Sequence, residues 1–132
     1  MKSTVDWADY APYFREYEFR CKHSGKCEMD NEFMSKLLAL RLAYGSSMTI
    51  TSGYRDKTHP IEAKKATTGA HTTGKACDVA VQGKDAYRLL KLALAQGFTG
   101  IGIQQKGSGR FIHLDTCESS PTMPRPGLWS YA

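Results

Sequence analysis

The sequence predicts a single α+β domain with a mostly antiparallel sheet and its helices on one side. Two segments, 30–44 and 84–96, have helical periodicity, and four short apolar runs have the length of strands. The chain has 132 residues, enough for one domain with one core, and no repeat or linker divides it. We therefore treat residues 1–132 as one domain.

The first helix is delimited by residues that favour its two ends. Asp30 is a suitable N-cap and Gly45 is a suitable stop. The large apolar residues between them fall on one face: Phe33, Leu37, Leu40 and Tyr44. The segment that precedes this helix, 1–29, is rich in aromatic residues.

The elements that follow are shorter. Residues 47–51 predict a strand, and residues 52–74 predict a loop without clear periodicity, of a length that is usually functional or disordered. A strand is expected at 75–81, before the helix 84–96. The remaining expected segments are the strands 99–104 and 110–115 and an extended, proline-rich tail, 119–132.

Polar residues interrupt two of the apolar strands. Because alternate side chains of a strand share a face, Asp78 lies opposite the apolar face of 75–81, which consists of Cys77, Val79 and Val81. In the same way, His113 shares a face of 110–115 with Phe111 and Asp115. If the two strands are neighbours, Asp78 and His113 meet, and His71 joins them from the preceding loop.

Two histidines and one carboxylate make a three-ligand zinc site. Its fourth position is left to water, as in catalytic sites, where zinc lowers the pKa of water and polarises a carbonyl. The alternative, three separately satisfied polar residues, stays open on spacing alone.

The four cysteines do not form paired CxxC knuckles, and a disulfide framework is not expected. Cys21, His23 and Cys27 form a compact group that could bind a second metal, but a fourth ligand is not apparent. Buried or free thiols are the favoured interpretation.

Four segments occur in an order that resembles a known family. They are "SGYR" (52–55), "AHTTGKACDV" (70–79), "FIHLD" (111–115) and "RPGLWSY" (125–131). The chain, over residues 14–131, resembles the zinc D-Ala-D-Ala carboxypeptidases and phage endolysin peptidases, a group that includes lysostaphin-type enzymes and the hedgehog signalling domain. The resemblance implies that fold, a Zn²⁺ cofactor and hydrolysis of peptide bonds in peptidoglycan stem peptides, by carboxypeptidase or endopeptidase action.

The resemblance also implies roles for individual residues. His71, Asp78 and His113 would bind zinc, and Arg55 would face the scissile carbonyl or a substrate carboxylate, where its rigid cationic fork suits an oxyanion. Trp129 would either close over the site or cover the core.

Two positions depart from the family pattern. Many relatives have a serine where this chain has Gly69, and a glutamate that acts as general base where it has Arg110. Asp115 is the candidate base, with a second possibility that it orients a zinc histidine. Glu118 and Glu62 are weaker candidates.

Charge and composition suggest where such a peptidase would act. The net charge is +5, a bias toward polyanions such as a bacterial wall, but the cations are scattered. We expect no nucleic-acid partner, no stable membrane association and a monomer. Residues 1–14 lack the apolar stretch of a secretory signal, so we expect a phage lysis enzyme that accumulates in the host cytoplasm and reaches the wall through a holin.

Two other functions remain open. One is a host D,D-carboxypeptidase. The other is a zinc-stabilised binding module of the hedgehog type that has lost catalysis, for which the absence of the glutamate at Arg110 is the supporting feature.

Overall fold

A five-stranded sheet runs through the centre of the protein, whose computed structural model describes residues 5–65, 67 and 69–131. The strands lie in the order β1-β2-β4-β3-β5. Three of the four pairings are antiparallel, and β5 pairs parallel to β3. The predicted α+β class with a mostly antiparallel sheet is confirmed. The strands are β1 (Thr49–Ser52), β2 (Ala76–Ala80), β3 (Gly100–Gln104), β4 (Phe111–Asp115) and β5 (Gly127–Ser130).

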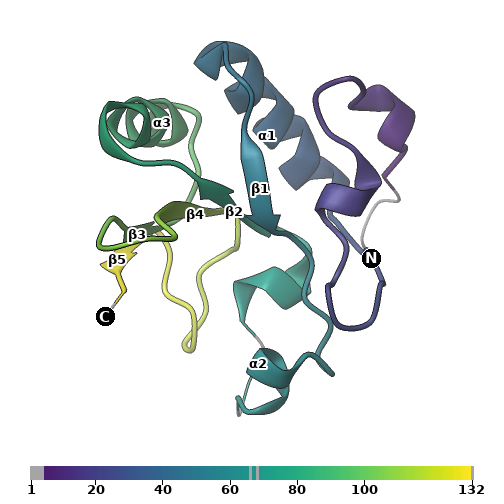
Figure 1. Cartoon of the computed structure of the whole chain (residues 1–132). Coiled ribbons are helices and arrows are strands. Elements are labelled where there is room, and N and C mark those ends of the chain that lie inside the picture. The colour runs from purple at the N-terminus through teal and green to yellow at the C-terminus, as the bar shows by residue number, and fades with distance from the viewer. Residues whose placement is uncertain (1–4, 66, 68, 132) are drawn as a thin grey trace.

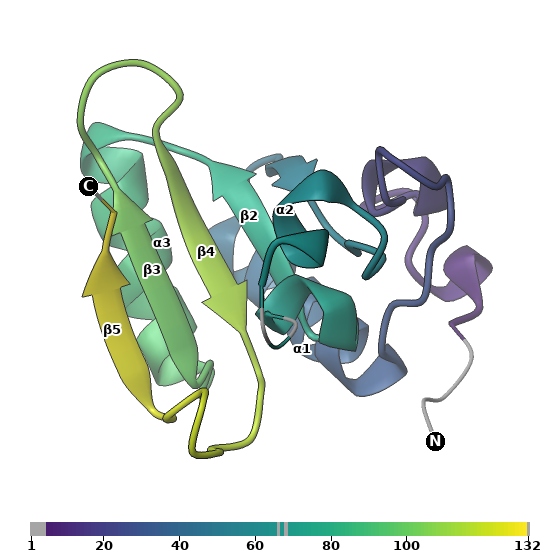
Figure 2. The ribbon, with the colours of Figure 1, turned by 90° about the horizontal axis from the view of Figure 1, so that it is seen from below.

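The two long helices lie on one side of this sheet. In Figure 1, α1 (Asn31–Tyr44) and α3 (Gly83–Ala95) are above the sheet and α2 (Pro60–Ala63) is below it. Figure 2, seen from below, shows β5, β3, β4 and β2 in front of α3 and α1. The face that the two long helices leave uncovered is the face that carries Asp78 and His113. The described chain also has three 3-10 turns: η1 (Trp7–Asp9), η2 (Glu16–Glu18) and η3 (Ala70–Thr73).

The core fills the space between the sheet and the two long helices. The alternation predicted for β2 and β4 is confirmed, because Cys77, Val79, Ile112 and Leu114 are all buried in this core. The aromatic residues before α1 close it, since Tyr10, Phe14 and Phe19 belong to the same buried cluster. Burial of apolar surface on this one face leaves the other face available for polar side chains.

The expectation of a loop over the whole of 52–74 was wrong, and the extended tail contains a strand that the sequence analysis did not predict. The segment 52–74 contains α2 and η3, and α2 begins at Pro60 with the His59 side chain accepting a hydrogen bond from the backbone of Ile61. The proline-rich tail contains β5, whose pairing with β3 depends on a partner strand distant in sequence. Both elements are too short to show periodicity, so pattern alone cannot detect them.

All four cysteines are free thiols, and Cys21 with Cys27 and His23 forms no metal-binding group within the described part of the chain. The interpretation as buried or free thiols is confirmed. None of the described helices is long and apolar enough to cross a membrane.

The N-cap of α1 gives a first testable prediction. The Asp30 carboxylate accepts a hydrogen bond of 2.9 Å from the backbone N–H of Phe33, and Asp30 is buried. Asp30→Ala should lower the free energy of unfolding by about 1 kcal/mol in urea titrations, because an N–H of the first turn loses its acceptor. Asp30→Asn keeps an acceptor and should stay close to the wild type. Equal losses in the two variants would contradict the capping role.

Candidate metal centre

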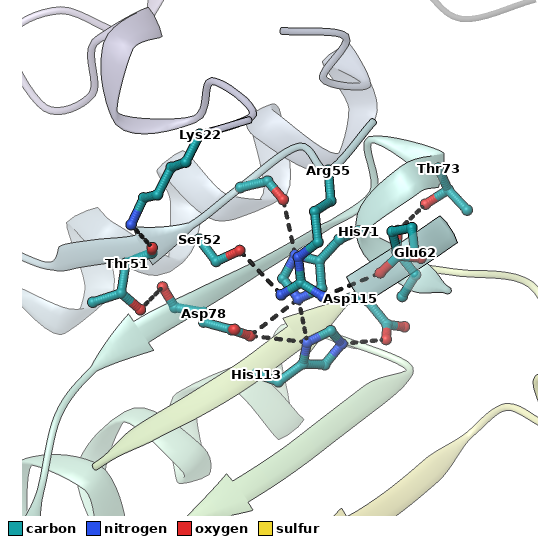
Figure 3. Close-up of polar contacts among 12 residues, drawn as sticks. Lys22, Thr51, Ser52, Arg55, Glu62, His71, Thr73, Asp78, His113 and Asp115 are labelled. Carbon is teal, nitrogen blue, oxygen red and sulfur yellow. Dashed lines mark hydrogen bonds and ion pairs between the residues drawn. The ribbon is translucent and has the colours of Figure 1, made fainter. Parts of the chain in front are cut away.

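His71, Asp78 and His113 come together on the sheet face that the long helices leave free. Asp78 of β2 and His113 of β4 are direct partners in the antiparallel register. His71 arrives from η3, the turn that precedes β2. Figure 3 shows the three side chains pointing toward one another. They are the group of metal-ligating residues found in the described chain, and all three are buried.

The turn η3 holds His71 at the edge of this face. The Thr73 hydroxyl donates to the carbonyl of Ala70 at 2.6 Å and accepts from the backbone N–H of Lys75 at 3.0 Å. The carbonyl of His71 accepts from the backbone N–H of Arg55 at 3.2 Å. The small and hydroxyl residues of "GAHTTG" therefore build a tight turn that carries a histidine to the start of β2.

The three ligating atoms lie within hydrogen-bond range of one another. Asp78 Oδ1 is 3.0 Å from His113 Nδ1 and 3.3 Å from His71 Nε2. The two ring nitrogens are 3.3 Å apart. Three atoms from three elements thus surround one point.

Hydrogen bonds on the far sides of the rings fix which nitrogens carry protons. His71 Nδ1 is 2.8 Å from the carbonyl oxygen of Gly53, which can only accept, so this nitrogen is the donor. His113 Nε2 is 2.7 Å from Asp115, again as donor to a carboxylate. In the neutral tautomers, His71 Nε2 and His113 Nδ1 therefore both turn a lone pair toward the Asp78 carboxylate. Three acceptors that converge in this way are stabilised by a cation between them, either a bound metal ion or a proton on one of the rings.

The donor set fits zinc. Two imidazole nitrogens and one carboxylate oxygen, with both imidazoles anchored through their second nitrogen, are the ligands of many zinc sites with an open position. Burial alone would raise the pKa of Asp78, yet its contacts with His113 and His71 hold that pKa well below its usual range, so Asp78 is a carboxylate and carries the negative charge that a metal ligand needs. Burial alone would lower the pKa of His113, but its hydrogen bonds with Asp115 and Asp78 raise it.

Asp115 lies behind His113, on the side away from Asp78. Its side chain is fully buried, and its two oxygens accept from His113, from the backbone N–H of Cys117 and twice from Arg125, at 2.7 and 2.9 Å. Burial alone would raise the pKa of Asp115, but the bonds from His113 and Arg125 hold it well below the usual range. This geometry favours the orienting role over that of a general base that reaches water in front of His113.

Arg55 is held by a second buried carboxylate. Its guanidinium donates to Glu62 at 3.1 Å and to the Ser52 hydroxyl at 3.3 Å. Glu62 is only 2% exposed and also accepts from Lys65 at 3.0 Å and from the backbone N–H of Gly69 at 2.8 Å. Glu62 therefore orients Arg55 and ties α2 to η3.

A cleft of about 610 Å³ opens above the ligands. Arg55 and Lys65 contribute to its lining, and its far side is aromatic, with the Trp129 ring 5.3 Å from the His113 ring. The structure thus places Trp129 against the site. Glu118 is exposed and lies outside this lining.

Arg110 does not face the cleft. Its guanidinium donates to the carbonyl of Gly107, and its side chain lies with Ile112 and Tyr87 in a groove beside α3. In an extended strand, a residue three positions before His113 lies on the opposite face. A glutamate at this position would not reach the ligands in this backbone conformation.

Sequence reasoning missed several residues that complete the site. A side chain at Gly100 would place its Cβ 2.3 Å from the Asp115 carboxylate, and one at Gly102 would place it 2.5 Å from Trp129 Nε1. Both glycines leave room over β3 for side chains from the neighbouring strands. The alternating glycines of "GIG" were the available signal, whereas nothing in the sequence pointed to Arg125 as the partner of Asp115.

A buried group of two histidines and one carboxylate, open to a cleft, has the ligands of a mononuclear metal centre. The sequence model of the Peptidase M15 family matches residues 12–115. The chain therefore belongs to the Peptidase M15 family, which is known as a zinc-dependent peptidase family. The match contains all three ligands and ends before β5. A search of curated proteins found no match.

The position of Asp115 predicts its effect on metal affinity. Asp115→Asn keeps an oxygen for His113 but removes the charge that holds the ring, so zinc affinity should fall about 10-fold to 100-fold. Competition with a chromogenic chelator would measure it. Asp85→Asn, which changes an exposed carboxylate on α3, is the control and should bind zinc like the wild type. Unchanged affinity in Asp115→Asn would contradict the orienting role.

Glu62 predicts a pH dependence of stability. Burial alone would raise its pKa, but hydrogen bonds from Gly69 and Lys65 lower it from 4.5 to about 2. A carboxyl with a depressed pKa stabilises the fold above pH 4.5, and this contribution is lost as the pH falls toward 2. A shift of this size corresponds to about 3 kcal/mol.

The measurement compares urea unfolding of the wild type and Glu62→Gln between neutral and acidic pH. The variant should be less stable at pH 7, and the difference should shrink as the pH falls through this range. A difference that does not depend on pH would contradict the assignment.

Proposed function

We propose that this protein is a zinc-dependent peptidase that hydrolyses peptide bonds in the stem peptides of bacterial peptidoglycan, as a D-Ala-D-Ala carboxypeptidase or as an endopeptidase. The observation that carries the proposal is the convergence of three acceptor atoms on the floor of an open cleft. Membership of the Peptidase M15 family supports the reaction class and favours D-Ala-D-Ala type substrates.

In this proposal, the three ligands and Arg55 have different roles. His71, Asp78 and His113 would hold the zinc ion, which when bound lowers the pKa of water and polarises a carbonyl oxygen. Arg55 lines the cleft, and Glu62 fixes its guanidinium, so the cation is preorganised to receive a substrate carbonyl or carboxylate. Preorganisation matters because a fixed donor does not have to reorient as charge develops.

The aromatic side of the cleft would position the peptide. Phe111 and Trp129 are half-buried and lie beside His113 in the lining. Flat apolar rings on one side and Arg55 with Lys65 on the other suit a short peptide with a carboxylate at one end. The rings would also keep bulk water from the reacting carbonyl, which strengthens the electrostatic interactions in the cleft.

We further propose that the protein is a phage endolysin that accumulates in the host cytoplasm and reaches the wall after a holin opens the membrane. The net charge of +5 supports this role, since it favours approach to an anionic wall. Peptidoglycan stem peptides are the proposed partner, with no nucleic acid and no stable membrane association, and the proposed state is a monomer.

One observation favours a second candidate, a zinc-stabilised binding module without catalysis. Asp78 is the one carboxylate in the described lining of the cleft, and it is a ligand. Asp115 and Glu62 lie beneath the surface with their oxygens engaged. A general base with a free carboxylate is therefore absent from the part of the cleft that the structure describes.

A digest of purified peptidoglycan tests the proposal. Mass spectrometry should detect new stem-peptide fragments from the wild type, and their masses identify the bond that is cut. A chelator and His113→Ala should each abolish the fragments, because each removes the metal centre. His23→Ala, which changes an exposed histidine outside the described lining of the cleft, is the matched control and should retain activity.

The outcomes separate the two candidates. If the wild type holds one equivalent of zinc that raises its thermal midpoint, yet releases no fragment, the peptidase proposal is wrong and the binding module is favoured. Fragments that persist in the chelator and in His113→Ala would show that hydrolysis does not depend on this centre.

A further inference from the structure

The described lining of the cleft contains one titratable side chain that is neither a candidate metal ligand nor a carrier of a fixed charge. The titratable groups of its described lining are three ligands, two arginines, Lys65 and Tyr131. Arginine does not lose its proton in proteins, and Lys65 is paired with the buried Glu62. Tyr131 remains, and its segment lies outside the part of the chain that the family model matches.

The backbone and ring of Tyr131 are held beside the site. Its backbone N–H donates to the carbonyl of Ile103 at 3.3 Å, which continues the pairing of β5 with β3. Its ring packs on Phe111, with centroids 5.1 Å apart. These contacts place the side chain over the sheet face that carries the ligands.

Gly102 brings the Tyr131 hydroxyl next to His113. In the sheet register, Gly102 pairs with His113 on one side and with Trp129 on the other. The Tyr131 oxygen lies 2.7 Å from the point that a Cβ of residue 102 would occupy. The hydroxyl thus occupies the space that a side chain at Gly102 would fill, on β3, which pairs with the strand of His113.

The hydroxyl hydrogen remains available to a substrate. Trp129 Nε1 and the Tyr131 hydroxyl oxygen lie together above Gly102, at 2.5 and 2.7 Å from the point that its Cβ would occupy. Because an indole N–H can only donate, the phenol oxygen is the acceptor in a hydrogen bond between them. Burial raises the pKa of Tyr131, and this hydrogen bond only partly offsets the effect, so the phenol stays protonated at neutral pH. A protonated hydroxyl with an occupied acceptor side is oriented to donate.

We propose that Tyr131 is a catalytic residue whose hydroxyl donates a hydrogen bond to the carbonyl oxygen of the scissile bond as that oxygen becomes negative. No proton is transferred in this step, so the phenol is unchanged at the end of the reaction. The strand order places Tyr131 beyond β4 and Arg55 beyond β2. The Tyr131 hydroxyl and the Arg55 guanidinium, both hydrogen-bond donors, thus lie on opposite sides of the ligands. If Tyr131 contacts the scissile carbonyl, Arg55 can bind the substrate carboxylate. The inference rests on the proposed peptidase function.

Tyr131→Phe tests the role, with Tyr87→Phe as the matched control because Tyr87 is 74% exposed on α3. Initial rates would be measured on a soluble stem-peptide fragment that the wild type cleaves. For Tyr131→Phe, kcat should fall about 100-fold or more while KM changes little, because the hydrogen bond forms mainly in the transition state. Tyr87→Phe should match the wild type.

Two readouts separate catalysis from structure. Affinity for a phosphinate analogue of the same peptide, a mimic of the tetrahedral state, should fall by about the factor seen in kcat/KM. Zinc content and thermal midpoint should equal those of the wild type.

A kcat equal to that of the wild type in Tyr131→Phe, or loss of zinc from this variant, would overturn the inference about Tyr131 but not the proposed function. A wild-type protein that cleaves no stem peptide would overturn the proposed function and the inference with it.

Discussion

Three hydrogen-bond acceptors that face one another in a buried position are stabilised by a cation between them, and much of this structure serves to bring the three together. Each histidine has its proton drawn to the far side, by the carbonyl of Gly53 for one ring and by Asp115 for the other. Both free nitrogens then face Asp78. An apolar side chain in place of any of the three would remove one of the acceptors that face one another. This accounts for the polar residues Asp78 and His113 within the otherwise apolar strands β2 and β4.

Two buried carboxylates support the site from behind, and each is paired with an arginine. Asp115 holds His113 and is itself held by Arg125, whereas Glu62 holds Arg55 and links it to Lys65. A buried charge is tolerated only when it is paired and hydrogen-bonded, so removal of one partner leaves the other uncompensated. Both pairs also join segments that the chain separates: one attaches the tail to β4, and the other attaches α2 to the segment after β1. The same two ion pairs therefore stabilise the fold and position the residues of the site.

Local patterns predicted the parts of the structure that depend on local chemistry. The caps of α1 are read from Asp30 and Gly45, and the shared face of Asp78 and His113 follows from strand alternation. The rest depends on contacts between segments distant in sequence. Arg125 approaches Asp115 only because β5 lies beside β3, an association that no periodicity of the tail encodes.

The same limit applies to the burial of Glu62 and to the roles of glycine. From the sequence alone, Glu62 is an acid in a polar loop and is expected to be exposed. In the structure it is buried, and it accepts hydrogen bonds from Arg55 and from the backbone N–H of Gly69. The alternating Gly100 and Gly102 read as a weak strand, since glycine adds no side-chain packing. Their function is visible only when Asp115 and Trp129, from the strands on either side, occupy the space above them.

The balance of charge around the cleft bears on what it can receive. Arg55, Lys65 and Arg125 are matched by three carboxylates, one in the ligand set and two beneath the surface, Glu62 and Asp115. Because these charges cancel, a divalent ion would leave the cleft with an excess of positive charge, in a place where screening by water is weak. With such an ion bound, the cleft would favour an anionic ligand in the ground state. It would stabilise even more strongly a carbonyl oxygen that becomes negative in the transition state, since that charge would develop close to the ion. A cleft without a free carboxylate is therefore well suited to stabilise an oxyanion, and its catalytic power would come from cations and hydrogen-bond donors fixed in advance.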